Sequence, residues 1–170
     1  MRLRELKIED VDNMLEWMRD ESVSCGFRDG IAQTTYVQAV EFINAAKTKC
    51  ADGKSVHFAI ADSNDEYLGT VSLKHIDVEN SNGEYAIALR SIAQGKGIGT
   101  WATKQILKIA FEEFRLNKVY LNVLSHNIKA IRLYERCGFE FEGKSKEHVF
   151  IGGEFKDLLW YSMLRKDYIN

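Results

Sequence analysis

The pattern of apolar and polar positions in the first third of the chain predicts one strand and two helices. Residues 1–7 alternate, as in a strand. A helix is expected to begin at the acidic pair Glu9–Asp10 and to fade over residues 22–26. Residues 26–33 are expected to form a loop, and the spacing of Thr35 and Gln38 predicts a capping box at the next helix. The apolar faces of these helices are Val11, Met14, Leu15 and Met18, then Tyr36, Val40 and Ile43.

After a turn predicted at residues 51–54, the hydrophobic period changes to two. Three strands are predicted, and they span residues 56–61, 67–76 and 84–89. Turns at residues 63–66 and 80–83 separate them, and Gly69 is a candidate for a bulge. Because the turns are short, the three strands should form an antiparallel meander.

The remaining elements alternate between helices and strands. The helix after residue 97 is expected to bury Ala102, Ile106, Ile109, Ala110 and Phe114. Residues 118–123 predict a strand parallel to the third meander strand, because a helix connects the two. A short helix over residues 127–137 ends at Gly138, and residues 139–168 predict two strands around Gly152–Gly153. Together these elements predict an α/β (α+β) fold, with a mixed sheet of about seven strands and about four helices.

Composition narrows the class of protein. The 170 residues suffice for one domain, and no linker or repeat divides them, so residues 1–170 are predicted to form a single domain. A net charge of −2 gives no argument for nucleic acid or a charged membrane surface. Apolar runs are too short for a membrane span, and the N-terminus lacks the apolar core of a signal peptide. Cys25, Cys50 and Cys137 have no metal-ligand spacing, which favours a reduced, cytoplasmic protein without a metal.

A glycine-rich turn between a strand and a helix is the first candidate for chemistry. Gly95, Gly97 and Gly99 alternate there, and the free amides of the helix start favour a phosphate or pyrophosphate. A P-loop needs Gly-Lys followed by Ser or Thr, whereas Lys96 precedes Gly97. The dinucleotide pattern fails because its third glycine falls on Thr100. A general nucleotide-binding module stays open as an alternative that rests on this turn alone.

Two further motifs occur in order along the chain. The first is Gln94-x-x-Gly97-x-Gly99, and the second and more specific one is His126-Asn127-x-x-Ala130-x-x-x-Tyr134-x-x-x-Gly138-Phe139. Together they resemble the GNAT superfamily of N-acetyltransferases over nearly the whole chain, and the first looks like the family's coenzyme A pyrophosphate loop. The C-terminal run from Glu142 to Tyr161 further resembles the branch of ribosomal-protein N-terminal, spermidine and amino-sugar acetyltransferases.

The resemblance implies a GNAT-type fold, with a splayed parallel strand pair, that uses acetyl-CoA. Ile87 and Leu89 would pair with the pantetheine arm through their backbone groups, and Asn127 and Ala130 would contact the pantetheine or the adenine-side arm. Many relatives have Pro where this chain has Ser91, but Pro only stiffens the turn, so binding is still expected. Gln94 would contribute to the turn, and the pyrophosphate would be held by Thr100 and by the amides of Gly95, Lys96, Gly97, Ile98 and Gly99.

By the same resemblance, three residues are candidates for catalysis. Tyr134 would donate a proton to the departing thiolate, since a phenol with a pKa of roughly 10 is protonated at neutral pH. The Leu89 amide would stabilise the negative charge that develops on the thioester oxygen. Glu84 is a candidate base for the attacking ammonium, although a solvated strand-end glutamate is an equal alternative.

The acceptor is a primary amine of unassigned identity. Residues 17–36 are expected to cover its pocket, and the stretch 17–43 faintly resembles amino-sugar acetyltransferases, which favours an amino sugar or nucleotide-linked amino sugar over a polyamine or protein N-terminus. A non-catalytic acyl-CoA sensor on the same fold is the alternative function. A homodimer through the C-terminal strands is compatible with the family. The mixed aromatic and charged residues of the expected pocket are Trp17, Phe27, Tyr36, Arg19, Arg28, Asp20, Glu21 and Asp29.

Overall fold

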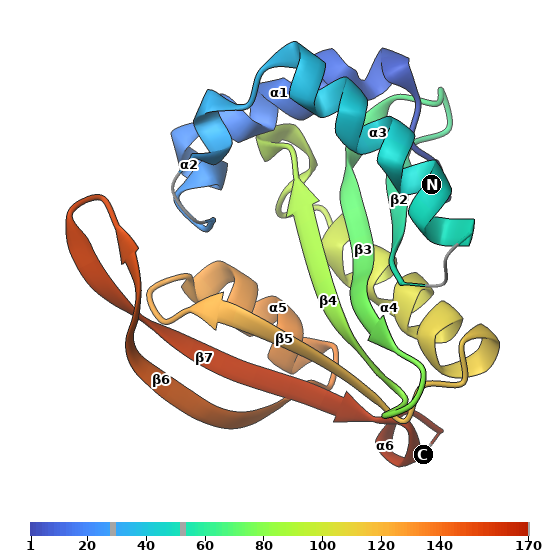
Figure 1. Cartoon of the computed structure of the whole chain (residues 1–170), viewed down its shortest axis with the longest axis vertical. Helices are drawn as coiled ribbons and strands as arrows, with labels where there is room; N and C mark the ends of the chain where they lie inside the picture. The colour runs from blue at the N-terminus through green and yellow to red at the C-terminus, as the bar shows by residue number, and fades with distance from the viewer. Residues whose placement is uncertain (28–29, 52–53, 170) are drawn as a thin grey trace.

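A mixed seven-stranded sheet runs through the molecule in the order β1-β2-β3-β4-β5-β7-β6 (Figure 1). The computed structural model describes residues 1–27, 30–51 and 54–169. The predicted antiparallel meander is confirmed by β2, β3 and β4, and the predicted parallel pair by β4 and β5. The strands are β1 (Arg2–Glu5), β2 (Val56–Ala61), β3 (Tyr67–Asp77), β4 (Asn82–Leu89), β5 (Lys118–Leu124), β6 (Glu140–Ile151) and β7 (Glu154–Leu164).

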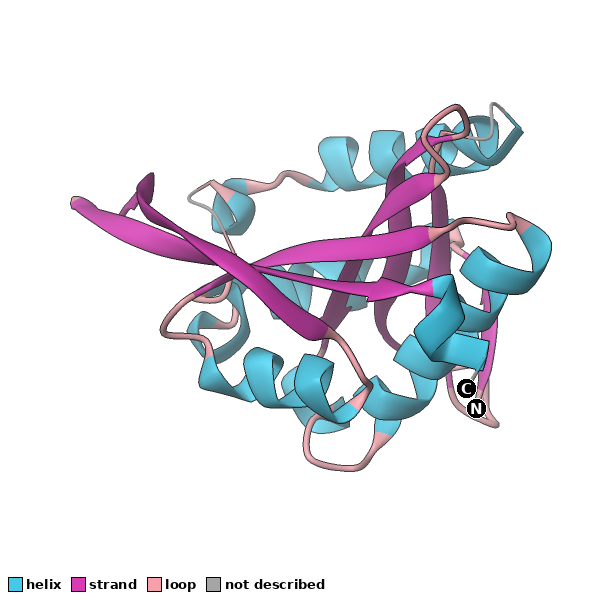
Figure 2. Ribbon diagram, turned by 90° about the horizontal axis from the view of Figure 1, so that it is seen from below, coloured by secondary structure: helices cyan, strands magenta, loops and turns pink. Residues whose placement is uncertain are grey.

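Helices cover both faces of this sheet (Figure 2). The four predicted helices are α1 (Val11–Arg19), α3 (Tyr36–Ala51), α4 (Ile98–Lys108) and α5 (Ile128–Arg136). Two short ones, α2 (Glu21–Ser24) and α6 (Arg165–Ile169), were not predicted. The first helix breaks at Asp20, which has extended backbone and whose carboxylate accepts a hydrogen bond from the Ser22 amide. The chain therefore turns before α2 instead of fading out of one helix.

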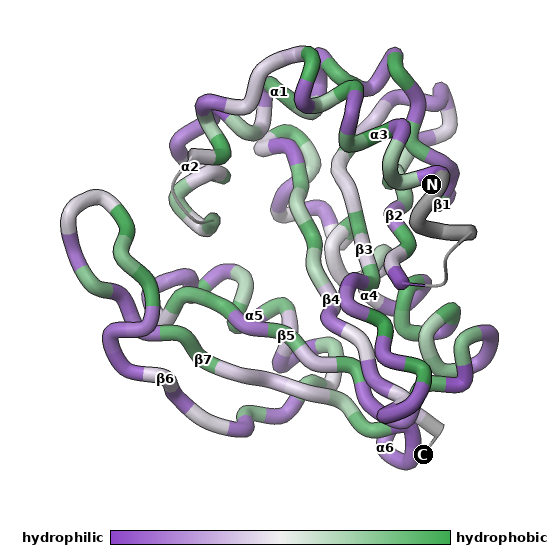
Figure 3. The backbone as a smooth tube through the Cα atoms, viewed as in Figure 1, coloured by the Kyte–Doolittle hydropathy of each residue, from purple (hydrophilic) through white to green (hydrophobic). Residues whose placement is uncertain are grey.

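The core lies in two layers, one on each side of the sheet. Apolar residues of α1 and α3 pack on one face, and those of α4 and α5 pack on the other. Side chains alternate along β4, so Ala88 joins the first layer and Tyr85 the second. In Figure 3, apolar residues recur along β4 and β5, whereas the edge strand β6 is mostly polar. Tyr36 is 50% exposed, so the buried face of α3 is Ala39, Ile43 and Ala46 rather than the face predicted from Tyr36.

Two predicted turns differ in detail. The loop at 26–33 includes residues 28 and 29, and the turn at 51–54 includes residues 52 and 53, all outside the described residues. Residues 31–33 form a 3-10 turn, and α3 continues to Ala51. The turn predicted at 80–83 lies at 78–81, because Asn82 already pairs with Asp77 as the first rung of the hairpin. The capping box of Thr35 and Gln38 is present, with each backbone amide bound to the other's side chain.

The bulge predicted at Gly69 lies one residue earlier. Ile60 pairs with Gly69 and Ala61 with Tyr67, which leaves Leu68 as the extra residue. Gly69 is needed for another reason, since a Cβ there would lie 2.3 Å from the carbonyl oxygen of Ala88. The close approach of β3 to the end of β4 therefore depends on glycine at this position.

The parallel strands β4 and β5 stay together over only a short distance. They pair at three positions, where Asn82, Gly83 and Glu84 face Lys118, Val119 and Tyr120. On its other side β5 pairs with β7 along its whole length, and beyond the three rungs the β4 and β5 ribbons diverge (Figure 1). From Tyr85 to Leu89, β4 is therefore paired with β3 alone among the described strands.

Candidate active site

The unpaired edge of β4 presents backbone groups that β5 would otherwise satisfy. The Arg90 amide donates to the Leu68 carbonyl oxygen at 3.0 Å, and the β3–β4 register has no shift between Leu89 and Glu84. Since antiparallel hydrogen bonding alternates, the N–H and C=O groups of Ile87 and Leu89 point away from β3, toward the opening. An extended ligand arm can add there as a strand would.

The glycine loop leads from this edge into α4. Gly95 and Gly97 have φ angles of +73° and +78°, a region that strains residues with a Cβ. The first backbone bond of α4 runs from the Trp101 amide to the Gly97 carbonyl, so the amides just before Trp101 point out of the helix start. Gln94 donates from Nε2 to the Leu89 carbonyl at 3.3 Å and so closes the turn. Lys96 is exposed, Ile98 is buried and Thr100 is half-buried.

Gly99 permits a close approach between the loop and its surroundings. A Cβ at this position would lie 3.2 Å from Leu133 of α5 and 3.3 Å from Leu89. The helix start, the end of β4 and α5 are therefore packed against one another without room for a larger residue. This arrangement fixes the outward amides with respect to α5.

Helix α5 starts opposite the open edge, at Asn127. The Asn127 side chain caps the helix by accepting a hydrogen bond from the Ala130 amide at 3.2 Å. A Cβ on Gly26 would lie 2.6 Å from Asn127 Nδ2, so the segment after α2 packs directly on this cap. The structure thus shows a structural use for Asn127 and Ala130 that does not depend on a ligand. The contact between Gly26 and Asn127 also joins the segment after α2 to the N-terminus of α5, beside the opening.

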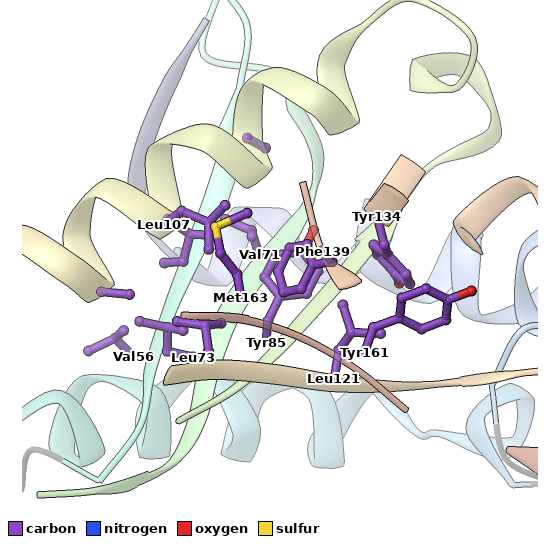
Figure 4. Packing of buried hydrophobic residues seen from close by; sticks show 14 of the residues in the cluster. Val56, Val71, Leu73, Tyr85, Leu107, Leu121, Tyr134, Phe139, Tyr161 and Met163 are labelled. Atoms are coloured by element: carbon purple, nitrogen blue, oxygen red, sulfur yellow. The ribbon is translucent and has the colours of Figure 1, made fainter. Parts of the chain in front are cut away.

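Tyr134 lies among buried aromatic rings of the core layer on the α4 and α5 side of the sheet (Figure 4). Its ring meets those of Tyr85 and Phe139 edge-on, with centroids 5.7 and 6.1 Å apart. Within the described residues, no protein group hydrogen-bonds the Tyr134 hydroxyl, whereas the Tyr85 hydroxyl is bound to Thr103 Oγ1 at 2.8 Å. Burial, with a smaller contribution from Cys137, raises the pKa of Tyr134 above its ordinary value. The phenol therefore stays protonated and keeps its hydroxyl available to a ligand.

Glu84 is placed at the last shared rung of β4 and β5. Its carboxylate binds Lys74 at 3.1 Å, His75 Nδ1 at 2.8 Å and the Asn122 amide at 3.4 Å. His75 reaches it because a register shift leaves His75 with a φ of +48°. Partial burial raises the pKa of Glu84, but the Lys74 charge and the His75 hydrogen bond outweigh burial, and the net pKa is lowered. The group is thus an ionised, firmly held carboxylate.

The acid and base candidates face opposite sides of the sheet. Consecutive residues of a strand point in opposite directions, so Glu84 faces the α1 and α3 side while Tyr85 carries the Tyr134 contact on the α4 and α5 side. Between them lies the point where β4 and β5 part. A substrate that donates a group and is held along β4 can meet, in this gap, a second substrate that arrives from the other face of the sheet.

A pocket of about 740 Å³ opens at the α2 end of the molecule. Cys25, just after α2, lies on one side, and Ser125 and His126, between β5 and α5, lie on another. The β6–β7 hairpin, from Glu147 to Asp157, completes the lining. Its position beside the α5 cap makes it the candidate acceptor pocket.

The aromatic residues expected in an acceptor pocket are used elsewhere. Trp17 is buried and donates from Nε1 to the Tyr67 hydroxyl at 3.1 Å, and Phe27 packs on it with a centroid distance of 5.3 Å. Tyr36 lies in the first turn of α3. Arg28 and Asp29 lie outside the described residues. Trp17 is therefore a core residue, and no aromatic platform for a sugar ring is built from this set.

Across residues 1–27, 30–51 and 54–169, no three or more His, Cys, Asp or Glu side chains are grouped so as to hold a metal ion. In the same part of the chain, no helix is both long and apolar enough to cross a membrane.

The open strand pair, the glycine loop and the buried tyrosine define an acyl-CoA-dependent transferase, and sequence comparison agrees. The model of the acetyltransferase (GNAT) domain family matches residues 1–140. The spermidine N(1)-acetyltransferase of Vibrio cholerae is 33% identical over 119 residues, which are 70% of this chain and 69% of that protein. The putative ribosomal N-acetyltransferase YdaF of Bacillus subtilis is 34% identical over 100 residues, 59% of this chain and 55% of that protein.

A solved structure shows the same fold. The crystal structure of spermidine N-acetyltransferase from Vibrio cholerae, in complex with CoA and spermine, superposes with a TM-score of 0.89 at 27% identity and covers 99% of this chain and 98% of that one. The chain belongs to the GNAT acetyltransferase family. It is an N-acetyltransferase that uses acetyl-CoA, as predicted. These relatives give the non-catalytic sensor alternative no support.

The sequence did not indicate the residues that hold the two catalytic candidates. Tyr134 packs against Tyr85, and Glu84 binds Lys74, His75 and Asn122. Each of these partners occurs in an ordinary strand pattern. Only the alternation of β4, which places Tyr85 on the apolar face, carried any indication of such a role.

Proposed function

We propose that this enzyme acetylates a primary amine of a polyamine by direct attack on acetyl-CoA, with Tyr134 as the general acid. One observation supports this most: an available, protonated phenol and an ionised carboxylate flank the point where β4 and β5 part. The pyrophosphate is held by the amides of the glycine loop, and the pantetheine arm pairs with Ile87 and Leu89.

In the reaction, the amine nitrogen attacks the thioester carbon after losing its ammonium proton to water or a base. The oxygen gains negative charge, which the outward Leu89 amide stabilises. The carbon–sulfur bond then breaks, and the hydroxyl proton of Tyr134 moves to the thiolate. The nitrogen, positively charged since the attack, loses its second proton through water to the tyrosinate, which leaves a neutral amide and restores the phenol. Glu84 acts by attracting the ammonium to the gap, because its lowered pKa makes it a weak base. No acyl-enzyme is formed.

The charge of the candidate acceptor pocket favours a polycation. Its lining holds three carboxylates, Glu147, Glu154 and Asp157, against one ammonium, Lys156. Lys156 binds Glu154, and Lys144 binds Asp157, so Glu147 is the carboxylate left to meet a ligand. A nucleotide-linked amino sugar would favour arginines as well as exposed aromatics, and the described lining of this pocket has the exposed Phe155 but no arginine. The amino-sugar acceptor therefore ranks second to a polyamine, which is the acceptor named for the similar Vibrio cholerae enzyme and bound in its crystal structure.

The test is an initial-rate assay of CoA release with spermidine, spermine, a nucleotide-linked amino sugar and a peptide, with products identified by mass spectrometry. We expect turnover of the polyamines, with intersecting rather than parallel lines when both substrates are varied. Glu147→Gln should raise the KM for spermidine by about fivefold, equivalent to about 1 kcal/mol for an exposed charge pair. Glu140→Gln, on the same strand but outside the pocket lining, is the matched control. Turnover of the amino sugar alone would overturn the polyamine proposal.

A homodimer through the C-terminal strands stays a prediction. The edge strand β6 leaves Phe141 and Phe150 more than half exposed, which is compatible with pairing between two copies.

A further inference from the structure

Arg90 follows the last residue of β4, and its buried guanidinium meets two glutamates, Glu16 and Glu66, whose side chains are 47% and 49% exposed. The Arg90 side chain is only 9% exposed. Nε and Nη2 donate to the two carboxylate oxygens of Glu16 at 3.2 and 2.7 Å. Nη1 donates to Glu66 Oε1 at 2.7 Å and to the Tyr67 carbonyl at 3.0 Å. Four hydrogen bonds thus hold one cation in a fixed orientation.

The three partners come from different parts of the fold. Glu16 belongs to α1, the helix that leads to α2 and the acceptor pocket. Glu66 ends the turn before β3, and Tyr67 is the first residue of β3, the strand that pairs with β4. Arg90 itself separates Leu89 from the glycine loop, and its carbonyl accepts from the Ala93 amide at 2.9 Å to begin the turn. One side chain therefore ties the acceptor-side helix to the strand end that carries the outward Leu89 amide.

We infer that Arg90 is a positioning residue that fixes the end of β4 and the following loop for acetyl-CoA, through its bonds to Glu16 and Glu66. The inference rests on the proposed binding of the pantetheine arm along β4. Small displacements of a strand end misalign both the Leu89 amide and the loop amides, and misalignment of about 1 Å costs binding and rate steeply. Lysine cannot replace the arginine, because an ammonium lacks the planar fork that engages both oxygens of Glu16.

The molecule supplies a matched control for this inference. Arg4 on β1 is 11% exposed and makes the same kind of fork, to Asp10 at 2.8 and 2.7 Å, with a further bond to Asp65 at 2.7 Å. Two strands, β2 and β3, lie between β1 and β4. Arg4→Lys therefore removes a comparable ionic junction that has no bond to Arg90, the end of β4 or the glycine loop. It holds the same turn from the other side, through the side chain and carbonyl of Asp65, so it controls for a loosened turn.

The experiment compares the full-length wild type, Arg90→Lys and Arg4→Lys by thermal denaturation, by calorimetric titration with acetyl-CoA and by initial rates. We expect both variants to lose thermal stability, while Arg90→Lys alone raises the Kd for acetyl-CoA by about tenfold or more and lowers kcat. Glu66→Gln, which keeps an acceptor oxygen for Nη1, should give a smaller increase in Kd and serves if Arg90→Lys does not fold. The Kd is measured without an acceptor, so a wrong acceptor does not affect the result.

Two outcomes would overturn the inference. In the first, Arg90→Lys, or Glu66→Gln in its place, keeps the wild-type Kd and kcat within about twofold, which would leave Arg90 a purely structural residue. In the second, Arg4→Lys raises the Kd as much as Arg90→Lys, which would show a general loosening of the fold. Failure of the proposed function looks different, because the wild type itself would then not acetylate polyamines, whatever the variants do to the Kd for acetyl-CoA.

Discussion

Replacing Tyr134 by Phe separates chemistry from packing in this enzyme. The change removes one oxygen and keeps the ring that packs on Tyr85 and Phe139. Since no described protein group hydrogen-bonds that hydroxyl, its loss leaves no partner unsatisfied. We expect the stability of the fold to stay the same or to rise by up to about 1 kcal/mol.

The expected kinetic effect is large by comparison. Loss of a general acid lowers rates by about a hundredfold, and each tenfold corresponds to about 1.36 kcal/mol, so the barrier should rise by about 2.7 kcal/mol. Because burial raises the pKa of Tyr134, the wild-type kcat should show no decline from its ionisation between about pH 6 and about pH 9. The assay is CoA release at saturating substrates, together with calorimetric binding of acetyl-CoA, which should be unchanged.

Tyr85→Phe is the matched control, since the same atom is removed from the adjacent ring. The Tyr85 hydroxyl binds Thr103, whose own hydroxyl keeps its bond to the Gly99 carbonyl at 2.7 Å. This variant should lose about 1 kcal/mol of stability, or about 2–4 °C in Tm, with kcat nearly unchanged. A kcat for Tyr134→Phe within about threefold of the wild type would refute the general-acid assignment. So would an equal loss of kcat in both variants.

Two other substitutions test the loop and the carboxylate. Gly97→Ala places a Cβ in open space but at a φ of +78°, so it should cost about 1–2 kcal/mol of stability and raise the Kd for acetyl-CoA. Gly143→Ala is the control, because its Cβ also lies in open space but its φ is not positive, and it should change neither quantity. Equal effects of the two variants in calorimetry and thermal denaturation would contradict this reasoning. Glu84→Gln removes a group whose folded pKa lies below its ordinary value near 4.5, so the stability it contributes is present above that value and is lost as pH falls through the lowered pKa. Denaturant titrations should show a difference between wild type and variant at neutral pH that closes at acidic pH, and a gap that persists at about pH 3 would argue against the ion pairs.

The elements that sequence analysis located well are those whose burial is regular. Strand alternation in 56–61 and the spacing of glycines around Gly97 depend on local geometry, so both were visible in the sequence. The break at Asp20 was not, because it depends on a side chain that captures a backbone amide two residues on. The sequence also indicates acidic and basic residues but not their partners, so the junction of Arg90 with Glu16, 74 positions earlier, could not be foreseen.

The wrong placement of Trp17 has a similar cause. Trp17, with its polar ring nitrogen, was expected near a ligand, yet Tyr67 satisfies that nitrogen inside the core. The pocket that the structure shows draws residues from around 25, 126 and 147–157, and only the fold brings these segments together. Candidate residues within one motif, such as Asn127 and Tyr134, kept their expected relation because a single helix carries them.

The short pairing of β4 with β5 also affects how the backbone exchanges hydrogen with solvent. The amides of Ile87 and Leu89 lie near the middle of a seven-stranded sheet, yet they have no strand neighbour on the side to which they point. In the free enzyme they should exchange as fast as amides in an exposed loop, while those of Ala86 and Ala88, bonded to β3, exchange slowly. Cofactor binding would then protect alternate residues of one strand, a pattern that neither global stabilisation nor closure of a loop produces.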